Sequence, residues 1–421
     1  MVAQAQRCAV TDPFSPFRLA GLSLRNRIIK TATFESMSPG GCVSQALIEH
    51  HRALAVGGVA MTTVAYCAVA PDGRTFADQL HMRQELVPDL RALTAVVHAG
   101  GAAASLQLGH CGAFCNNHDL IRRRPVGPSR ALNLVGALSG RVLADAMTEA
   151  EIEEVTGAFV EAARLAREAG FDAVELHLGH GYLLSQFLSP GSNARRDRFG
   201  GSLENRARFA LSVVERVRAA LPAKMPVLAK VNLRDGFRGG LELEESVQVA
   251  RWLEARGTNA LVLSGGFVSR NPFYLFRGER PLRQMIAVEK SWAQKLALAL
   301  FGPALIHAYP FEPLYFLPLA REIRRAVRMP LVLLGGIKSR DDLDTAMREG
   351  FELAAMGRAL IHDPSLIAKY AAGSARESGC VPCNQCVAEM DREGGVCCAK
   401  VPSQIAERAA HVRTAKTSPS P

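Results

Sequence analysis

Short apolar runs rich in branched side chains alternate with longer amphipathic stretches along most of the chain. Apolar runs of about four to eight residues are typical of buried strands, and apolar residues recurring about every three or four positions are typical of helices. Strands are expected at residues 27–33, 59–69, 102–108, 173–178, 227–233, 260–264, 331–334 and 353–356. Helices are expected at residues 44–55, 84–99, 148–169, 202–221, 243–256, 313–327 and 339–349, and an eighth begins near Pro364. A strand followed by a helix therefore occurs eight times.

This repetition favours a closed parallel barrel, the (β/α)8 fold, over an open doubly wound sheet. An open dinucleotide-binding sheet would carry a glycine-rich turn directly after its first strand, whereas the chain continues from Thr33 as Phe-Glu-Ser-Met-Ser-Pro-Gly40. The third helix starts with Thr148-Glu-Ala-Glu151, which is the pattern of a capping box. We therefore expect a single α/β barrel over residues 14–375.

Three segments depart from the regular alternation. Between Gly266 and Pro313 the sixth unit carries a long aromatic insertion. Inserted loops on the catalytic face of a barrel form lids or substrate walls, but the apolar composition of this one equally fits a subunit contact or a membrane-surface patch. After the barrel we expect a cysteine-containing extension over residues 376–406, and then a disordered tail that ends in Ser, Thr and Pro over residues 407–421.

Composition and charge narrow the class of protein. The 421 residues are 48% hydrophobic and 21% charged, which is typical of a soluble globular protein. The formal net charge of +10 comes from scattered basic residues, and the run Arg122-Arg123-Arg124 is short, so no nucleic-acid partner is expected. No secretory signal is expected, because residues 1–13 have no apolar segment after a charged start. No apolar run reaches about 18 residues, and the ten cysteines are expected to be mostly free thiols. These features indicate a cytoplasmic protein without a transmembrane segment.

The segment His177-Leu-Gly-His180-Gly-Tyr182 begins at the end of the fourth expected strand. Active sites of such barrels lie at the carboxyl ends of the strands, so polar side chains there are candidates for catalysis. The His-x-x-His spacing could mark a metal site, but no third histidine or cysteine lies nearby, and the two histidines could also simply cap a loop. We prefer a third interpretation, without a metal. Two neutral imidazoles would hold a substrate carbonyl or nitro oxygen, while Tyr182 would donate a proton to the adjacent carbon.

Four further strand ends carry candidate ligand-binding residues, and three of them are suited to an anionic or phosphorylated ligand. Lys230 would end strand five, where a buried ammonium group needs an anion, unless its stem extends outward to solvent. Gly335-Gly336 and Gly357-Arg358 follow strands seven and eight, where barrels commonly bind phosphate, although ordinary turns would look the same. Gln107, at the end of strand three, carries an amide that could pair with a pyrimidine-like edge.

From about Pro16 to Met390 the sequence resembles the old yellow enzyme family of FMN-dependent NAD(P)H oxidoreductases and ene-reductases, and its barrel is similar to that of 2,4-dienoyl-CoA reductase. The resemblance rests on Leu24-Arg-Asn-Arg-Ile28, on Gln107 with His110, and above all on Val174-Glu-Leu-His-Leu-Gly-His-Gly-Tyr-Leu-Leu-Ser-Gln-Phe-Leu188. That stretch continues through Ser192-Asn193, Arg195, Asp197 and Gly200-Gly-Ser-Leu-Glu-Asn-Arg-Ala-Arg-Phe209. A match this long and specific does not recur by chance.

The resemblance implies an enzyme that binds FMN and takes electrons from NADH or NADPH. The residues implied to bind FMN are Ala32, Thr33, Phe34, Tyr66, Gln107, Lys230, Gly336, Gly357 and Arg358. Among them, Gln107 would hydrogen-bond the flavin pyrimidine ring, and Arg358 would hold the phosphate together with the two glycines. Lys230 would lie near N1 of the flavin, where a positive charge stabilises the anionic reduced form.

For the substrate, the resemblance implies that His177 and His180 bind the electron-withdrawing group of an activated alkene and that Tyr182 donates the proton. The expected reaction is hydride transfer from flavin N5 to the β-carbon of that small, electron-poor acceptor. Two rivals stay open: the same fold and FMN with a dienoyl reduction or an oxidative demethylation, and a flavin-binding protein with little turnover. The physiological acceptor, the choice between NADH and NADPH and the oligomeric state, including a homo-oligomer, also stay open.

Two features depart from the family pattern. Many relatives carry Thr or Cys, which hydrogen-bonds the flavin, at the position of Phe34. Since Phe cannot do so, we expect an altered flavin potential, and an unmoved midpoint in Phe34→Thr would contradict this.

Cys380, Cys383 and Cys386, followed by Cys397-Cys398, lie where some relatives bind a [4Fe–4S] cluster. Because the second spacing is two residues rather than three, free or structural thiols are preferred over an iron–sulfur or zinc site.

Overall fold

Eight parallel strands close into a barrel in the spatial order β10-β11-β12-β13-β3-β4-β5-β9. This computed structural model describes residues 11–417 apart from 118–119, 122–123, 134–135, 137–139 and 391. The barrel strands are β3 (Ile28–Lys30), β4 (Met61–Ala68), β5 (Ala103–Gly109), β9 (Ala173–Leu178), β10 (Val227–Asn232), β11 (Ala260–Ser264), β12 (Leu331–Leu334) and β13 (Leu353–Met356). The predicted (β/α)8 fold is confirmed, and β9, β11, β12 and β13 have the predicted bounds.

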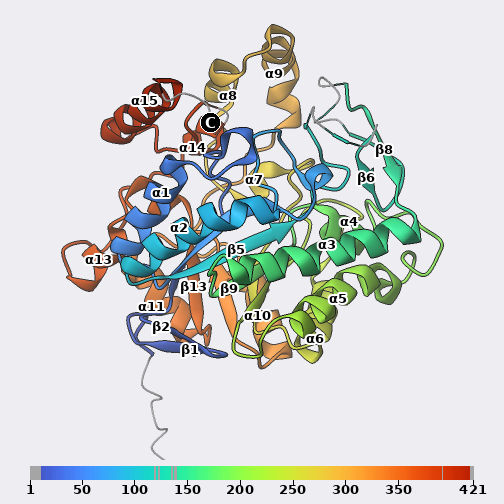
Figure 1. Ribbon diagram of the computed structural model, residues 1–421, viewed down its shortest axis with the longest axis horizontal. Helices are drawn as coiled ribbons and strands as arrows, with labels where there is room; N and C mark the ends of the chain where they lie inside the picture. Colours follow the sequence, from blue (N-terminus) through green and yellow to red (C-terminus); the bar gives the residue numbers. More distant parts are fainter. Residues whose placement is uncertain are drawn as a thin grey trace, which may run out of the picture.

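Amphipathic helices surround the barrel, and their apolar faces join the strands in one large core (Figure 1). They are α1 (Gln45–Val56), α2 (Val87–Ala99), α3 (Glu149–Glu168), α5 (Leu203–Ala220), α6 (Leu243–Ala255), α10 (Leu317–Ala326), α11 (Arg340–Arg348), α12 (Arg358–His362) and α13 (Leu366–Ala371). The predicted capping box at α3 is present, because Thr148 N–H donates to Glu151 Oε2 over 2.7 Å and Glu151 N–H donates to Thr148 Oγ1 over 3.2 Å. The helix predicted from Pro313 begins only at Leu317, because Leu314 has a left-handed backbone with φ of 56°.

The first barrel strand is shorter than predicted. β3 ends at Lys30, whereas the sequence predicts a strand up to Thr33. Thr31 N–H still donates to Met356 O over 3.0 Å, but the backbone beyond it lines a cavity. Glu35 then turns back and places Oε1 2.6 Å from Lys30 Nζ. Residues 32–34 therefore line the cavity instead of continuing the strand.

Short strands that the periodicity does not predict close the amino end of the barrel and flank its other end. β1 (Phe17–Leu19) and β2 (Leu22–Leu24) form an antiparallel hairpin at the end of the barrel opposite α8 and α9 (Figure 1). Leu19 and Leu24 pack in the same cluster as the inward-facing Ile29 and Leu228, so this hairpin closes the floor of the barrel. A further small sheet contains β6 (Val126–Gly127), β7 (Ala131–Leu132) and β8 (Leu143–Ala146).

The predicted insertion after β11 forms three helices. They are α7 (Pro272–Leu275), α8 (Leu282–Val288) and α9 (Trp292–Leu305). α8 and α9 contact each other and project beyond the barrel (Figure 1). At the base of this projection, Gly278 N–H donates to Tyr309 O over 2.8 Å, which joins the two ends of the segment between them.

The two parts of this insertion differ in exposure. Trp292 and Leu300 of α9 are 77% and 63% exposed, whereas Leu275, Phe276 and Phe311, closer to the barrel, line the cavity described below. The base of the insertion therefore forms part of the cavity wall, in agreement with the expectation that an inserted loop on this face forms a lid or a substrate wall. Among the residues that the structure describes, no helix has both the length and the apolar character needed to cross a membrane.

The C-terminal extension folds back onto the carboxyl end of the barrel. Val396 N–H donates to Glu35 O over 2.8 Å, and Ser378 N–H donates to Lys338 O over 2.8 Å. The extension contains α14 (Gln385–Glu389) and α15 (Pro402–Thr417). α15 differs from the expected disorder after residue 406, because the run Ala-Glu-Arg-Ala-Ala-His-Val-Arg-Thr-Ala-Lys contains strong helix formers. Residues 418–421 of the expected tail, like Arg122 and Arg123 of the basic run, lie outside the described residues.

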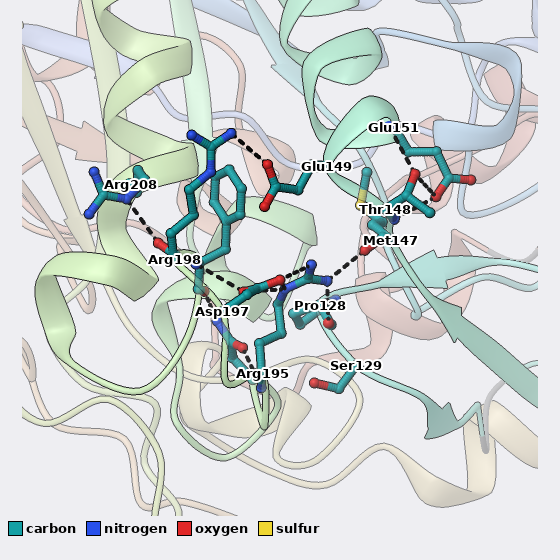
Figure 2. A network of polar contacts seen from close by, with 12 residues as sticks. Pro128, Ser129, Met147, Thr148, Glu149, Glu151, Arg195, Asp197, Arg198 and Arg208 are labelled. Carbon is teal, nitrogen blue, oxygen red and sulfur yellow. Dashed lines mark hydrogen bonds and ion pairs between the residues drawn. The ribbon is translucent and has the colours of Figure 1, made fainter.

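An arginine network joins the loop before α5 to the small sheet and to α3 (Figure 2). The guanidinium of Arg195 donates to Met147 O over 2.6 Å, to Pro128 O over 3.0 Å and to both carboxylate oxygens of Asp197. This pairing lowers the pKa of the Asp197 carboxyl below its usual range. Arg198 reaches Glu149 at 2.6 Å on the solvent side of the same loop. The loop that follows the His-x-x-His segment and α4 (Leu183–Leu188) is therefore fixed from several directions.

Replacing Arg195 with alanine is expected to lower the free energy of unfolding by about 1–3 kcal/mol, because it leaves two backbone carbonyls and a carboxylate without their donor. Arg198→Ala is the matched control, since it removes a solvent-exposed ion pair and should cost about 0–1 kcal/mol. Urea denaturation of both variants measures the difference. Equal losses in the two would show that the internal contacts of Arg195 add nothing.

Candidate active site

A cavity of about 250 Å³ lies at the carboxyl ends of the barrel strands. Its lining includes every site residue that the sequence predicts: Ala32, Thr33, Phe34, Tyr66, Gln107, His177, His180, Tyr182, Lys230, Gly336, Gly357 and Arg358. These residues are far apart in the chain, but a closed parallel barrel brings the carboxyl ends of its strands to one face. The structure thus places the whole predicted constellation around one space.

The two histidines and the tyrosine approach one another through an unusual turn. His180 and Gly181 have left-handed backbones, with φ of 61° and 78°, directly after β9. The ring centroids of His177 and His180 lie 4.9 Å apart with perpendicular planes, and those of His177 and Tyr182 lie 4.7 Å apart. A Cβ at Gly181 would lie 2.4 Å from the Phe267 ring, so glycine is required there. The turn therefore gathers three polar rings from six residues of chain.

Hydrogen bonds restrict the tautomers of the two imidazoles. Gly179 N–H donates to His177 Nδ1 over 3.4 Å, which leaves the proton of a neutral ring on Nε2. His180 Nε2 lies 2.6 Å from Ser264 Oγ, and when that hydroxyl donates, His180 carries its proton on Nδ1. Ser264 is a site residue that the sequence reasoning missed. Its place as the last residue of β11, directly before Gly265-Gly266, is the signal that could have revealed it.

Burial keeps these groups in their neutral forms. It lowers the pKa of His177 well below its ordinary value and lowers that of His180 to about 3, and the nearby Lys230 charge adds to both effects. Burial also raises the pKa of the Tyr182 phenol above its ordinary value. The cavity therefore contains two imidazole donors without net charge and a phenol that keeps its proton at neutral pH.

The rate of acceptor reduction is expected to be flat from about pH 5 to about pH 9, because none of these three groups titrates in that range. The lowered pKa of His180 means that it gains a proton only as the pH falls toward about 3, and the raised pKa of Tyr182 keeps its proton above the ordinary phenol range. Single-turnover reoxidation of the reduced holoenzyme, followed at several pH values, measures this. An inflection near the ordinary histidine pKa would contradict the expected neutral, buried histidines.

Lys230 enters the cavity from β10 and is 1% exposed, so the alternative of a lysine extending outward to solvent is wrong. Its Nζ lies 2.9 Å from Glu175 Oε1 and donates to Thr31 Oγ1 over 3.0 Å. Gln107 on β5 donates from Nε2 to the same Glu175 oxygen over 2.6 Å. Lys230 therefore has its anion within the protein, a partner that the sequence reasoning did not identify.

A second buried ion pair lies beside the first. Lys30 and Glu35 are both 1% exposed, and His51 Nε2 lies 3.6 Å from Glu35 Oε1. Burial lowers the pKa of Lys30 and raises that of Glu35, while the attraction between the two opposes both shifts. The repulsion of Lys230 lowers the pKa of Lys30 further, so the two pairs share one electrostatic environment.

The opposite side of the cavity is suited to a phosphate. Gly335 and Gly336 have φ of 105° and 79°, and a Cβ at Gly336 would lie 2.7 Å from the Leu314 nitrogen. Arg358 begins α12 and donates to Arg277 O over 2.9 Å and to Asn384 Oδ1. Lys338, which the sequence reasoning missed, also lines this part of the cavity. A glycine cradle with two cations, opposite a buried lysine and an amide, fits the phosphate and the isoalloxazine ring of FMN.

Aromatic rings form the remaining walls. Phe34 stacks on Phe76 with ring centroids 5.5 Å apart, and Tyr66 stacks on Tyr182 at 4.9 Å. Tyr66 donates its hydroxyl proton to Gly73 O over 2.9 Å, so its phenol is engaged by the backbone. Phe34 lines the cavity with a ring, where Thr or Cys would offer a hydrogen-bonding atom. Its expected effect on the flavin potential stays a prediction.

Four cysteines of the extension lie around a second, much smaller cavity of about 20 Å³: Cys380, Cys383, Cys386 and Cys398. Cys398 Sγ lies 3.4 Å from His362 Nδ1, and burial raises the pKa of the Cys386 thiol to about 12. Within the described part of the chain, no three His, Cys, Asp or Glu side chains are arranged to hold a metal ion. The preference for free or structural thiols stays a prediction that metal analysis of the purified protein would test.

Comparison with known proteins gives a consistent result. The model of the NADH:flavin oxidoreductase / NADH oxidase family matches residues 12–270. The chain is 46% identical over 377 residues to 4,4'-dithiodibutanoate disulfide reductase of Rhodococcus erythropolis, covering 89% of this chain and 92% of that protein. It is 31% identical over 389 residues to a metal reductase of Desulforamulus reducens, covering 91% of this chain but 52%, about half, of that relative. The solved old yellow enzyme homologue from Zymomonas mobilis matches with a TM-score of 0.68 at 20% identity, covering 88% of this chain and 95% of that one.

Proposed function

The chain belongs to the NADH:flavin oxidoreductase / NADH oxidase family, and from this premise we propose that it reduces a small electron-poor molecule bound against FMN in the barrel cavity. FMN, reduced by NADH or NADPH, supplies the hydride. The cavity residues bind and orient the acceptor and provide the proton. The observation that carries this proposal is the group of three neutral polar rings, His177, His180 and Tyr182, on one wall of that cavity.

Our first candidate acceptor is an activated alkene. Nε2–H of His177 and a ring N–H of His180 would donate to the carbonyl or nitro oxygen of the acceptor, where negative charge develops during hydride transfer. Because the imidazoles are neutral, they polarise this oxygen without adding full charge to an apolar cavity. The Tyr182 hydroxyl would then donate its proton to the α-carbon. The apolar wall of Phe34, Phe76 and Phe276 would exclude water from the reacting atoms.

A second candidate acceptor is an organic disulfide. The relative that is 46% identical carries the name of a 4,4'-dithiodibutanoate disulfide reductase, and it matches over nearly its whole length. Reduction of such a molecule takes one hydride and one proton, breaks the S–S bond and releases two thiols. In this chain the proton would again come from Tyr182, and the histidine N–H groups would stabilise the departing thiolate.

Steady-state oxidation of NADH and NADPH by the purified holoenzyme separates these candidates. We expect turnover with 2-cyclohexenone, with 4,4'-dithiodibutanoate, or with both, and mass spectrometry of the products identifies the saturated ketone or the free thiol. Bound FMN that NADH or NADPH reduces, but that neither acceptor reoxidises, would contradict the proposal and favour a flavin-binding protein with little turnover.

A further inference from the structure

One carboxylate connects the two polar groups proposed to recognise the flavin ring. Glu175 Oε1 accepts from Gln107 Nε2 over 2.6 Å and lies 2.9 Å from Lys230 Nζ. β9, which carries Glu175, is the barrel neighbour of both β5 and β10, so the three side chains extend from adjacent strands. All three are at most 3% exposed. The contact is therefore internal, and bulk water does not screen it.

We propose that Glu175 is a positioning residue that sets the electron affinity and the binding of FMN through Lys230 and Gln107. Lys230 and Gln107 line the cavity, whereas Glu175 lies behind them and acts only through them. The inference rests on the proposed contacts of Lys230 and Gln107 with the flavin. It does not depend on which acceptor the enzyme reduces.

The first part of the inference concerns the orientation of an amide. An ionised carboxylate accepts hydrogen bonds and cannot donate one, so Glu175 selects the orientation of Gln107 in which its NH2 group faces Glu175. The carbonyl oxygen of Gln107 is then directed away from Glu175. A flavin pyrimidine edge has both donors and acceptors, and an amide of fixed orientation matches it in one way only. Without the carboxylate, both orientations of Gln107 would be accessible.

The second part concerns charge. Lys30 pairs with Glu35 and Lys230 pairs with Glu175, so two neighbouring buried cations are each balanced by a buried anion. Glu175 therefore offsets part of the positive charge that Lys230 presents to the flavin. Removing this anion leaves one uncompensated positive charge in a medium of low dielectric constant, which favours the anionic reduced flavin. Glu175 thus limits how strongly the protein stabilises reduced FMN.

The test is the midpoint potential of the FMN holoenzyme in Glu175→Gln, a substitution of nearly equal size. We expect the midpoint potential to rise by at least about 30 mV. For a two-electron couple this corresponds to a tenfold increase in the ratio of reduced to oxidised flavin. Glu35→Gln is the matched control, because it removes an equally buried anion that contacts Lys30 instead of Lys230. A clearly smaller rise in this control supports the proposal. Equal rises in both variants, or no rise in Glu175→Gln, would overturn it.

A second measurement addresses Gln107 and does not use turnover. FMN titration of the apoprotein should show weaker binding in Glu175→Gln and in Gln107→Leu, and the losses should not add in the double variant, because Glu175 acts through Gln107. Additive losses would overturn that part of the proposal.

If Glu175→Gln does not fold, Glu175→Asp keeps the charge and shortens the reach. It should bind FMN more weakly with a nearly unchanged midpoint, and wild-type binding would contradict the inference. Neither the midpoint potential nor the FMN titration uses turnover, so both would test this inference even if the enzyme reduced none of the proposed acceptors.

Discussion

Replacing Tyr182 with phenylalanine is expected to slow reduction of an alkene acceptor by about 10²–10⁴-fold, which is the usual contribution of a positioned proton donor. The substitution removes one hydroxyl and keeps the ring that stacks on Tyr66 at 4.9 Å. Reduction of FMN by NADH or NADPH needs no proton from this group, so that half-reaction should keep its rate. Stopped-flow measurement of the two half-reactions separates the effects.

Tyr66→Phe is the matched comparison for Tyr182→Phe. The Tyr66 hydroxyl is already bonded to Gly73 O over 2.9 Å, so it is not placed to deliver a proton. We expect Tyr66→Phe to slow acceptor reduction much less than Tyr182→Phe. If both half-reactions slow equally in Tyr182→Phe, the hydroxyl stabilises the site in general, and its assignment as proton donor is wrong.

Replacing His177 with alanine is expected to lower kcat/KM for the acceptor by about 10²–10³-fold, the loss typical of one donor to a developing oxyanion. The imidazole is buried and neutral, and its N–H is directed by the Gly179 contact, so no solvent molecule replaces it with the same geometry. Steady-state kinetics with a carbonyl-activated alkene measures the loss. FMN content, read from the visible spectrum, should stay at one per chain.

Ser264→Ala gives a graded control for the histidine pair. It removes the hydroxyl that lies 2.6 Å from His180 Nε2 but leaves both imidazoles in place. The tautomer of His180 is then less restricted, and we expect a smaller loss of kcat/KM than in His177→Ala. A loss in Ser264→Ala that matches or exceeds the loss in His177→Ala would mean that tautomer control, rather than the donor itself, limits the reaction.

The strand ends explain why so much of the site is predictable from the sequence. In a parallel barrel, inward-facing polar residues near the carboxyl ends of the strands face the same cavity, so Gln107, His177 and Lys230 could be placed there without knowing a single distance. Their partners could not be assigned in the same way. Glu175 belongs to the run of residues that carries the family resemblance, but its role depends on side chains of two neighbouring strands. The register in which β9 pairs with β5 and β10 cannot be read from the sequence.

A local signal for Glu175 does exist. Side chains alternate between the two faces of a strand, so Glu175 shares the inner face of β9 with His177 two residues later. A carboxylate inside a barrel must be paired, and Lys230 is the cation that the adjacent strand offers. Lys30 differs, because it alternates with the inward-facing Ile29 and so points out of the barrel, where its anion is Glu35, five residues later.

The fold features that the sequence reasoning missed are short or marginal in composition. β1 and β2 have three residues each, which is too few for a period of two to stand out. α15 was obscured by the Ser, Thr and Pro of the last residues, although the preceding stretch contains good helix formers. Tertiary packing determines the hairpin of β1 and β2, and the composition of the stretch determines α15. Neither produces a periodicity that the sequence reveals.

The hydrogen bond from Gly278 to Tyr309 joins the two ends of the segment that contains α8 and α9. The chain between these two residues begins and ends at neighbouring positions, so changes within α9, its exposed part, need not move the barrel. Gly278 is fixed by its surroundings, because a Cβ there would lie 2.1 Å from Pro382 O. Directed evolution of acceptor choice can therefore vary Leu275, Phe276 and Phe311 on the barrel side of this hydrogen bond, and separately vary the exposed face of α9 to improve solubility or attachment to a support. α8 should be kept, because it packs against α14, and Val387 of α14 lines the same cavity.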